Sequence, residues 1–116
     1  MDEYKDTLVP LLDSLIEATS NGKISWEETG INTFRYISSD TSIIVAKDYD
    51  VLLAKDRGIS IKIYNKEGCL YEYIPLFLHE EDDFNMRLSV LFSEIEQMKF
   101  NKFSLVVKDV IERLKK

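Results

Sequence analysis

The stretch ISIKIYNKEGCLYEYI (residues 59–74) decides the fold that the sequence predicts. Its first half alternates isoleucine with Ser60, Lys62 and Tyr64, at the period of two that a half-buried strand requires. The following residues, NKEG (residues 65–68), are typical of a hairpin turn whose glycine adopts the left-handed conformation. The stretch therefore predicts a β-hairpin.

The turn also predicts which residues of this hairpin face each other. A three-residue loop with a G1 bulge places Asn65 opposite Cys69. The pairs that follow join aliphatic to aromatic residues on one face and a cation to an anion on the other: Ile63 with Tyr71, Ile61 with Tyr73, and Lys62 with Glu72. Such pairs contribute about 0.2–1 kcal/mol each. A slip of one residue would exchange the two faces and lose these pairs.

Three more β-rich runs precede the hairpin and are separated by short polar loops. They cover residues 33–38, 42–47 and 50–55. A turn is expected at residues 56–58. The apolar runs IIVA (43–46) and VLLA (51–54) are typical of central strands covered on both faces. We therefore expect a four- to five-stranded antiparallel meander over about residues 33–75.

An amphipathic helix is expected before this meander. Its apolar face comprises Tyr4, Leu8, Leu11, Leu12, Leu15, Ile16 and Thr19. With Thr7 as the N-cap, Pro10 falls in the first turn, where no intrahelical hydrogen bond needs its missing N–H. Gly22 is expected to end the helix in the left-handed conformation, with Ile24 packed back on the last turn.

Two further helices are expected after the meander. Asp82 or Asp83 is the predicted N-cap of the first, whose apolar residues run from Phe84 to Met98. Residues 100–103 interrupt this pattern. Ser104 is then expected to cap a last helix with its own apolar face, formed by Val106, Val107, Val110, Ile111 and Leu114. The predicted fold is α+β, in a single domain over residues 1–116.

Composition narrows the classes of function. The chain has 116 residues, of which 45% are hydrophobic and 31% charged, as in an ordinary globular domain. Its net charge of −6 opposes nucleic-acid binding. The basic residues of the C-terminal tail are typical of a helix C-terminus. The absence of a signal peptide and of a long apolar run predicts a cytoplasmic protein that does not bind membranes.

The sequence offers little for catalysis or metal binding. His79 precedes the acidic run of residues 80–83, but it is the sole histidine, and four adjacent acidic residues do not readily converge on one ion. A Cys69–His79 pair is disfavoured because Cys69 is expected on the core face of its strand. The glycines form no phosphate-binding loop. We therefore predict no enzymatic activity, no cofactor and no metal.

Aromatic residues on and beside the predicted sheet suggest recognition of another protein. The candidate interface residues are Trp26, Tyr36, Tyr49, Tyr64, Tyr71 and Tyr73. For Trp26, the competing interpretation is that it fills the gap between a helix and the sheet edge. The leading hypothesis is an acidic protein-interaction module, acting as a homodimer or as an inhibitor or immunity-type partner of another protein. The alternative is a small-ligand or enzymatic pocket between sheet and helices, lined by Trp26, Tyr71, Tyr73 and Cys69.

The order of these features resembles a diffuse group of small bacterial proteins without assigned function. The similarity depends on Thr19 followed by GKISWE (residues 22–27), on the Gly68 hairpin, and on LSVLF (residues 88–92) with Ile95. It spans most of the chain. The resemblance implies the order helix, meander, helix, helix, and it implies no activity.

Overall fold

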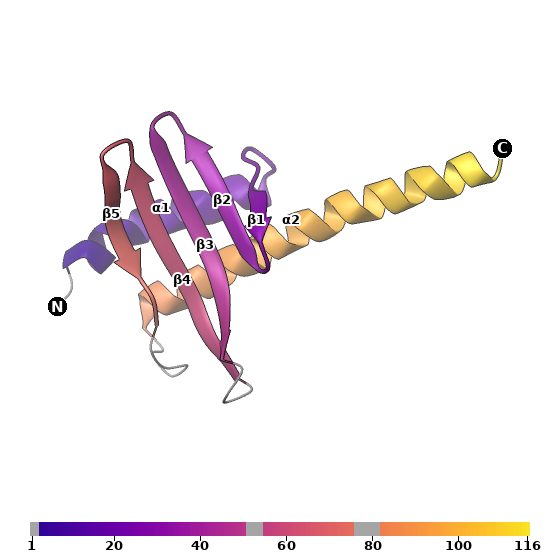
Figure 1. Ribbon diagram of the computed structural model, residues 1–116. Helices are drawn as coiled ribbons and strands as arrows, with labels where there is room; N and C mark the ends of the chain where they lie inside the picture. The colour runs from indigo at the N-terminus through magenta and orange to yellow at the C-terminus, as the bar shows by residue number, and fades with distance from the viewer. Residues whose placement is uncertain (1–2, 51–54, 76–81) are drawn as a thin grey trace.

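A computed structural model describes residues 3–50, 55–75 and 82–116 of the chain. Its elements are α1 (Glu3–Ser20), β1 (Glu27–Gly30), β2 (Thr33–Ser38), β3 (Thr41–Asp50), β4 (Lys55–Asn65), β5 (Gly68–Tyr73) and α2 (Asp83–Leu114). The strands form one antiparallel sheet in the order β1-β2-β3-β4-β5. Both helices lie on the same side of this sheet (Figure 1). The predicted α+β class, with an N-terminal helix and an antiparallel meander, is confirmed.

The register of the β4–β5 hairpin matches the three predicted pairs. Ile61 faces Tyr73, Lys62 faces Glu72, and Ile63 faces Tyr71. The expected pairing of Asn65 with Cys69 is wrong. An irregularity after Ile63 shifts the register by one residue, so that Tyr64 faces Cys69 and Asn65 faces Gly68. The turn is thus one residue shorter than expected, and the bulge lies in β5, where the register skips Leu70.

The core fills the space between one face of the sheet and the two helices. The sheet contributes Phe34, Ile43, Val45, Ile59, Ile61 and Ile63 to it. The helices contribute Leu12, Leu15, Phe84, Leu88, Leu91, Phe92 and Ile95. The residues between the buried ones along the strands, including Arg35, Ile44 and Lys62, lie on the opposite face of the sheet. Both helices therefore cover the same face.

Helix α1 begins earlier than the sequence predicts. It starts at Glu3, so Thr7 is not the N-cap and Pro10 lies inside the helix. The turn before Pro10 is supported by tertiary contacts, since the Tyr4 ring stacks on Tyr71 at 5.8 Å between ring centroids. The predicted end is confirmed: α1 ends at Ser20, and Gly22 follows with a φ of 71°.

The sheet extends beyond the predicted limits at its first edge. β1 has the polar sequence EETG, which lies outside the predicted meander, and it pairs with β2. An ion pair of 2.9 Å between the Arg35 guanidinium and the Glu27 carboxylate joins the two strands. The turn expected at residues 56–58 is wrong because these residues belong to β4. Most of the separate strand expected over residues 50–55 lies outside the described residues.

One C-terminal helix replaces the two that the sequence predicts. α2 continues from Asp83 to Leu114 through the segment FNKF (residues 100–103). This segment contains neither glycine nor proline, so nothing in its backbone opposes a helix. The side-chain amide of Gln97 donates a hydrogen bond of 3.0 Å to Asn101 along the helix surface. The interrupted pattern reflects a change in the direction of the apolar face within a single helix.

Trp26 fills the gap between α1 and the first edge of the sheet. Its side chain is 5% exposed, and its indole N–H donates a hydrogen bond of 2.9 Å to the Thr19 hydroxyl. The Thr19 hydroxyl in turn donates to the backbone carbonyl of Leu15 at 2.7 Å. The buried indole N–H is therefore satisfied by a residue on the last turn of α1.

We expect Thr19→Val to lower the free energy of unfolding by about 1–3 kcal/mol, because it leaves the buried indole N–H without an acceptor at nearly unchanged side-chain volume. Urea unfolding followed by tryptophan fluorescence measures the change.

Thr7→Val is the matched control in the same helix. The Thr7 hydroxyl is exposed and bonds only to a backbone carbonyl of its own helix, that of Glu3, so the expected change is within about 0.5 kcal/mol. Equal stability of Thr19→Val and the wild type would contradict the role of this hydrogen bond.

Candidate functional site

The C-terminal arm (residues 99–116) consists of the last part of α2 and the two residues that follow it, and it extends away from the sheet and from α1 (Figure 1). The part of α2 before the arm packs on α1 and on β3 and β4. The arm carries large apolar side chains that its own chain leaves exposed: Phe100, Phe103, Leu105, Val106, Val107, Val110, Ile111 and Leu114. Phe100 is 60% exposed, Phe103 63% and Leu114 79%.

Most of these side chains share one side of the helix. At about 100° per residue, six of them fall within an arc of roughly 100° around the axis. They are Phe100, Phe103, Val107, Val110, Ile111 and Leu114. Val106 borders this arc, whereas Leu105 lies away from it. We call the side defined by the six residues the arm face.

The arm face does not continue the buried side of α2. The buried residues from Phe84 to Ile95 centre on a direction that differs from that of the arm face by roughly 100° around the helix axis. In a straight helix, the direction of each side chain around the axis is fixed by its position in the sequence. The arm face is therefore directed away from the core that the first half of α2 helps to build.

Charge also separates the arm from the rest of the chain. Residues 99–116 contain six lysine or arginine residues and two acidic residues, a net charge of +4. A total of −6 leaves −10 for residues 1–98. At the base of the arm, Lys99 forms an ion pair with Glu28 of β1. Within the arm, Arg113 pairs with Asp109 one turn earlier, at 3.0 Å.

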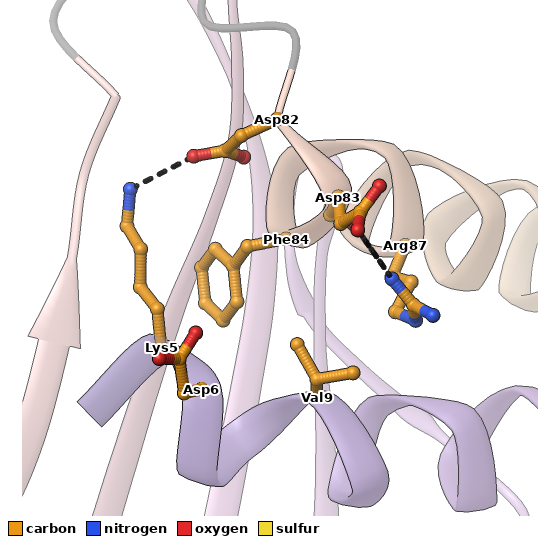
Figure 2. Close-up of a pocket in the computed structure, with 7 residues that line it drawn as sticks. All are labelled: Lys5, Asp6, Val9, Asp82, Asp83, Phe84 and Arg87. Atoms are coloured by element: carbon orange, nitrogen blue, oxygen red, sulfur yellow. Dashed lines mark hydrogen bonds and ion pairs between the residues drawn. The ribbon is translucent and has the colours of Figure 1, made fainter. Parts of the chain in front are cut away.

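A pocket of about 570 Å³ lies where the first turns of α1 and α2 meet (Figure 2). Its lining residues are Lys5, Asp6, Val9, Asp82, Asp83, Phe84 and Arg87. It is open to solvent and lies at one end of the helix layer. None of the four residues expected to line a pocket between sheet and helices contributes to it.

Both cations of this pocket form ion pairs with carboxylates of the two helix ends. The Lys5 ammonium lies 3.3 Å from the Asp82 carboxylate and 4.5 Å from the centroid of the Tyr73 ring. The Arg87 guanidinium lies 2.7 Å from Asp13 and 4.0 Å from Asp83. These contacts join the beginning of α2 to α1. The ion pairs around the pocket therefore help to hold the two helices together.

Asp82 is the N-cap of α2, as the sequence predicts. Its carboxylate accepts hydrogen bonds of 2.8 Å from both the backbone N–H and the side-chain amide of Asn85. Desolvation by itself would raise the pKa of the Asp82 carboxyl. The hydrogen bonds from Asn85 and the ammonium of Lys5 outweigh that effect and hold this pKa below its ordinary value.

Among the histidine, cysteine, aspartate and glutamate residues in the described parts of the chain, no cluster of three or more could hold a metal ion. His79, the residue on which the metal and Cys–His hypotheses depend, lies outside the described residues. Cys69 is exposed, which corrects the expectation that it lies on the core face.

The predicted interface residues lie in different places. Trp26 is buried, and Tyr36, Tyr71 and Tyr73 are half-buried against the core. Tyr64 is also half-buried. The side chain of Tyr49 lies outside the described residues. Trp26 and Tyr36 are neighbours, with 5.6 Å between ring centroids, but the sheet does not gather the described members of this set on one open surface.

The arm face is the surface that sequence reasoning missed. Its signal is present in the sequence, because the spacing from Phe100 to Leu114 alternates between three and four residues. From the sequence alone, Phe100 and Phe103 are instead assigned to a break between two helices, and the last helix is given an apolar face of its own, from Val106 to Leu114. The arm face is exposed because α2 continues past the edge of the sheet (Figure 1).

Comparison of the chain with protein-family models, with curated proteins and with solved structures finds no match. Within the described ranges, neither helix combines the length and the apolar character needed to cross a membrane.

We expect Asp82→Ala to lower the free energy of unfolding by about 0.5–2 kcal/mol at pH 7, the usual effect of losing an N-cap. Asp82→Asn keeps an acceptor but loses the charge. Because the folded-state pKa of Asp82 is depressed, its charge stabilises the fold above the unfolded-state pKa, and this contribution is lost as pH falls through the folded-state pKa. The difference between wild type and Asp82→Asn should therefore shrink below about pH 4.

Asp83→Asn is the control, since Asp83 lies in the first turn of the same helix but is far more exposed and does not cap it. Denaturant unfolding between pH 3 and pH 7 measures all four proteins. A difference between wild type and Asp82→Asn that stayed constant over this range would contradict the role assigned to the Asp82 charge.

Proposed function

We propose that this protein is a non-enzymatic protein-interaction module and that it binds its partner through the arm face. The observation that carries this proposal is the exposure of six large apolar side chains on one side of a helix that extends beyond the body. Isolated exposed apolar residues are common on protein surfaces, but contiguous apolar patches are typical of binding sites.

The composition of the arm face supports recognition of protein. It has aromatic residues at the base, Phe100 and Phe103, and aliphatic residues toward the tip. An amphipathic helix of this kind binds by laying its apolar side along a groove or along another helix. Aromatic side chains supply much of the buried area at such contacts.

Residues 1–98, which we call the body, contribute more to the rate at which the protein meets its partner than to the final contact. The body's charge of −10 favours approach of a basic surface, as an inhibitor or immunity-type partner would require, whereas the arm favours an acidic surface. Both a second copy of this chain and a different protein are compatible with such a distribution.

The alternative of a small-ligand or enzymatic site gains less support. The pocket at the junction of the helices has polar groups, but both of its cations form ion pairs, Lys5 with Asp82 and Arg87 with Asp13 and Asp83. Among the described residues, no serine, threonine, cysteine or histidine lines it. We therefore favour the arm face as the functional surface.

Site-specific photo-crosslinking tests this proposal in the living cell. A benzophenone amino acid at position 103 lies on the arm face, and the same group at position 101 lies on the other side of the helix. We expect covalent protein adducts from position 103 and far fewer from position 101.

The mass of the adduct separates a second copy of the chain from another protein. Equal yields from both positions, or no protein adduct from position 103, would contradict binding through the arm face.

A further inference from the structure

We propose that the partner of the arm face is a second copy of this chain, and that the two arms pair side by side in antiparallel orientation. This inference rests on the proposed function, because it names the partner of the same surface. The resulting dimer has a two-fold axis across the middle of the paired arms, so both copies use identical contacts.

The spacing of the arm face fits helix-to-helix pairing. Apolar residues repeat at alternating intervals of three and four, which is the heptad pattern of a coiled coil. The seam consists of Phe100, Phe103, Val107, Val110 and Leu114. Val106 and Ile111 flank it and extend its apolar width. One helix with such a seam is complementary to another of the same kind.

Charge selects the antiparallel orientation. The two arms, each of charge +4, lie side by side in either orientation, but parallel arms would also bring two bodies of charge −10 to the same end. Antiparallel arms place each basic tip beside the acidic body of the other copy and keep the bodies at opposite ends of the pair. Opposite charges are then adjacent at both ends.

A specific register follows from pairing the seams in this orientation. Phe103 lies opposite the partner subunit's Val107, and Phe100 lies opposite the partner subunit's Val110. Aromatic residues thus meet small aliphatic ones in the central layers, which permits close packing. Continuing this register places Arg113, Lys115 and Lys116 of each tip near residues 94–97 of the other copy, a segment that contains Glu94 and Glu96.

The shape of the molecule and the area available fit such a dimer. The arm extends past the sheet of its own subunit (Figure 1). The arm of a partner subunit can therefore lie along it. The exposed fractions of the six residues of the arm face correspond to roughly 500 Å² per copy, or roughly 1,000 Å² in the dimer, close to the lower limit for a specific interface. Contacts between each tip and the other body would add to this area.

Light scattering over a concentration series tests the assembly with the full chain. We expect a mass of twice 13.5 kDa for the wild type. Val107→Glu puts a charge in the centre of the seam and should raise the dissociation constant at least about 100-fold, giving a monomer. Asn101→Glu is the matched control: it makes the same change of charge on the other side of the helix and should leave the dimer intact.

A disulfide test reports the orientation. In a Cys69→Ser background, Ser104→Cys lies beside the two-fold axis of the antiparallel pair, so the two thiols meet and oxidation should give a covalent dimer. In a parallel pair these positions lie on opposite sides of the coil. Gln97→Cys, one heptad earlier, faces a different residue of the partner and should not cross-link to itself.

The outcomes separate this inference from the proposed function. A monomeric wild type whose position 103 still cross-links to a different protein overturns self-pairing and leaves the interaction module standing. A monomer that instead sediments with vesicles of anionic phospholipid overturns self-pairing in favour of a membrane surface. A Val107→Glu variant that remains a dimer overturns the seam, and a Ser104→Cys variant that fails to cross-link overturns the orientation.

Discussion

The packing of Phe84, Leu88, Leu91 and Ile95 against the sheet fixes the direction of α2, and the rest of the structure depends on it. These residues are almost completely buried, and they pack the first half of the helix beside α1 and against strands β3 and β4. A helix is stiff over this length, so its first half determines where its second half points. The arm is exposed because the anchored half directs it past the edge of the sheet.

The same constraint explains why the arm face cannot reach the core. The six residues of the arm face centre on a direction roughly 100° from the anchored side, so bending the helix toward the sheet would still point them away from the core. The described parts of the chain leave these six residues exposed. The charge asymmetry has a related consequence, since the acidic body and the basic arm are complementary to each other but separated within one molecule.

Local chemistry predicted the features that depend on neighbouring residues. The cross-strand pairs from Ile61 to Ile63, the left-handed Gly22 and the N-cap Asp82 each follow from a turn or cap a few residues long. Trp26 as the plug beside α1 was likewise one of two interpretations that the sequence offered.

The features that the sequence did not predict depend on tertiary contacts. β1 has no strand-forming composition and exists because β2 pairs with it. The turn before Pro10 is helical because Tyr4 and Lys5 contact β5 and α2. At Phe100 the apolar residues move to another side of the helix. The sequence alone permits either a break in the helix or a change of apolar face within one helix. The continuity of α2 through this segment decides for the change of face.

Helix α2 is one continuous helix whose second half has an uncovered apolar face. Backbone NMR chemical shifts of residues 96–106 test this continuity most directly, because Cα shifts report helical conformation residue by residue. We expect uninterrupted helical shifts through Phe100, Asn101, Lys102 and Phe103. Shifts characteristic of a turn at these four residues would contradict it, since a break there would allow the last segment to fold back onto the body and bury Val107 and Val110.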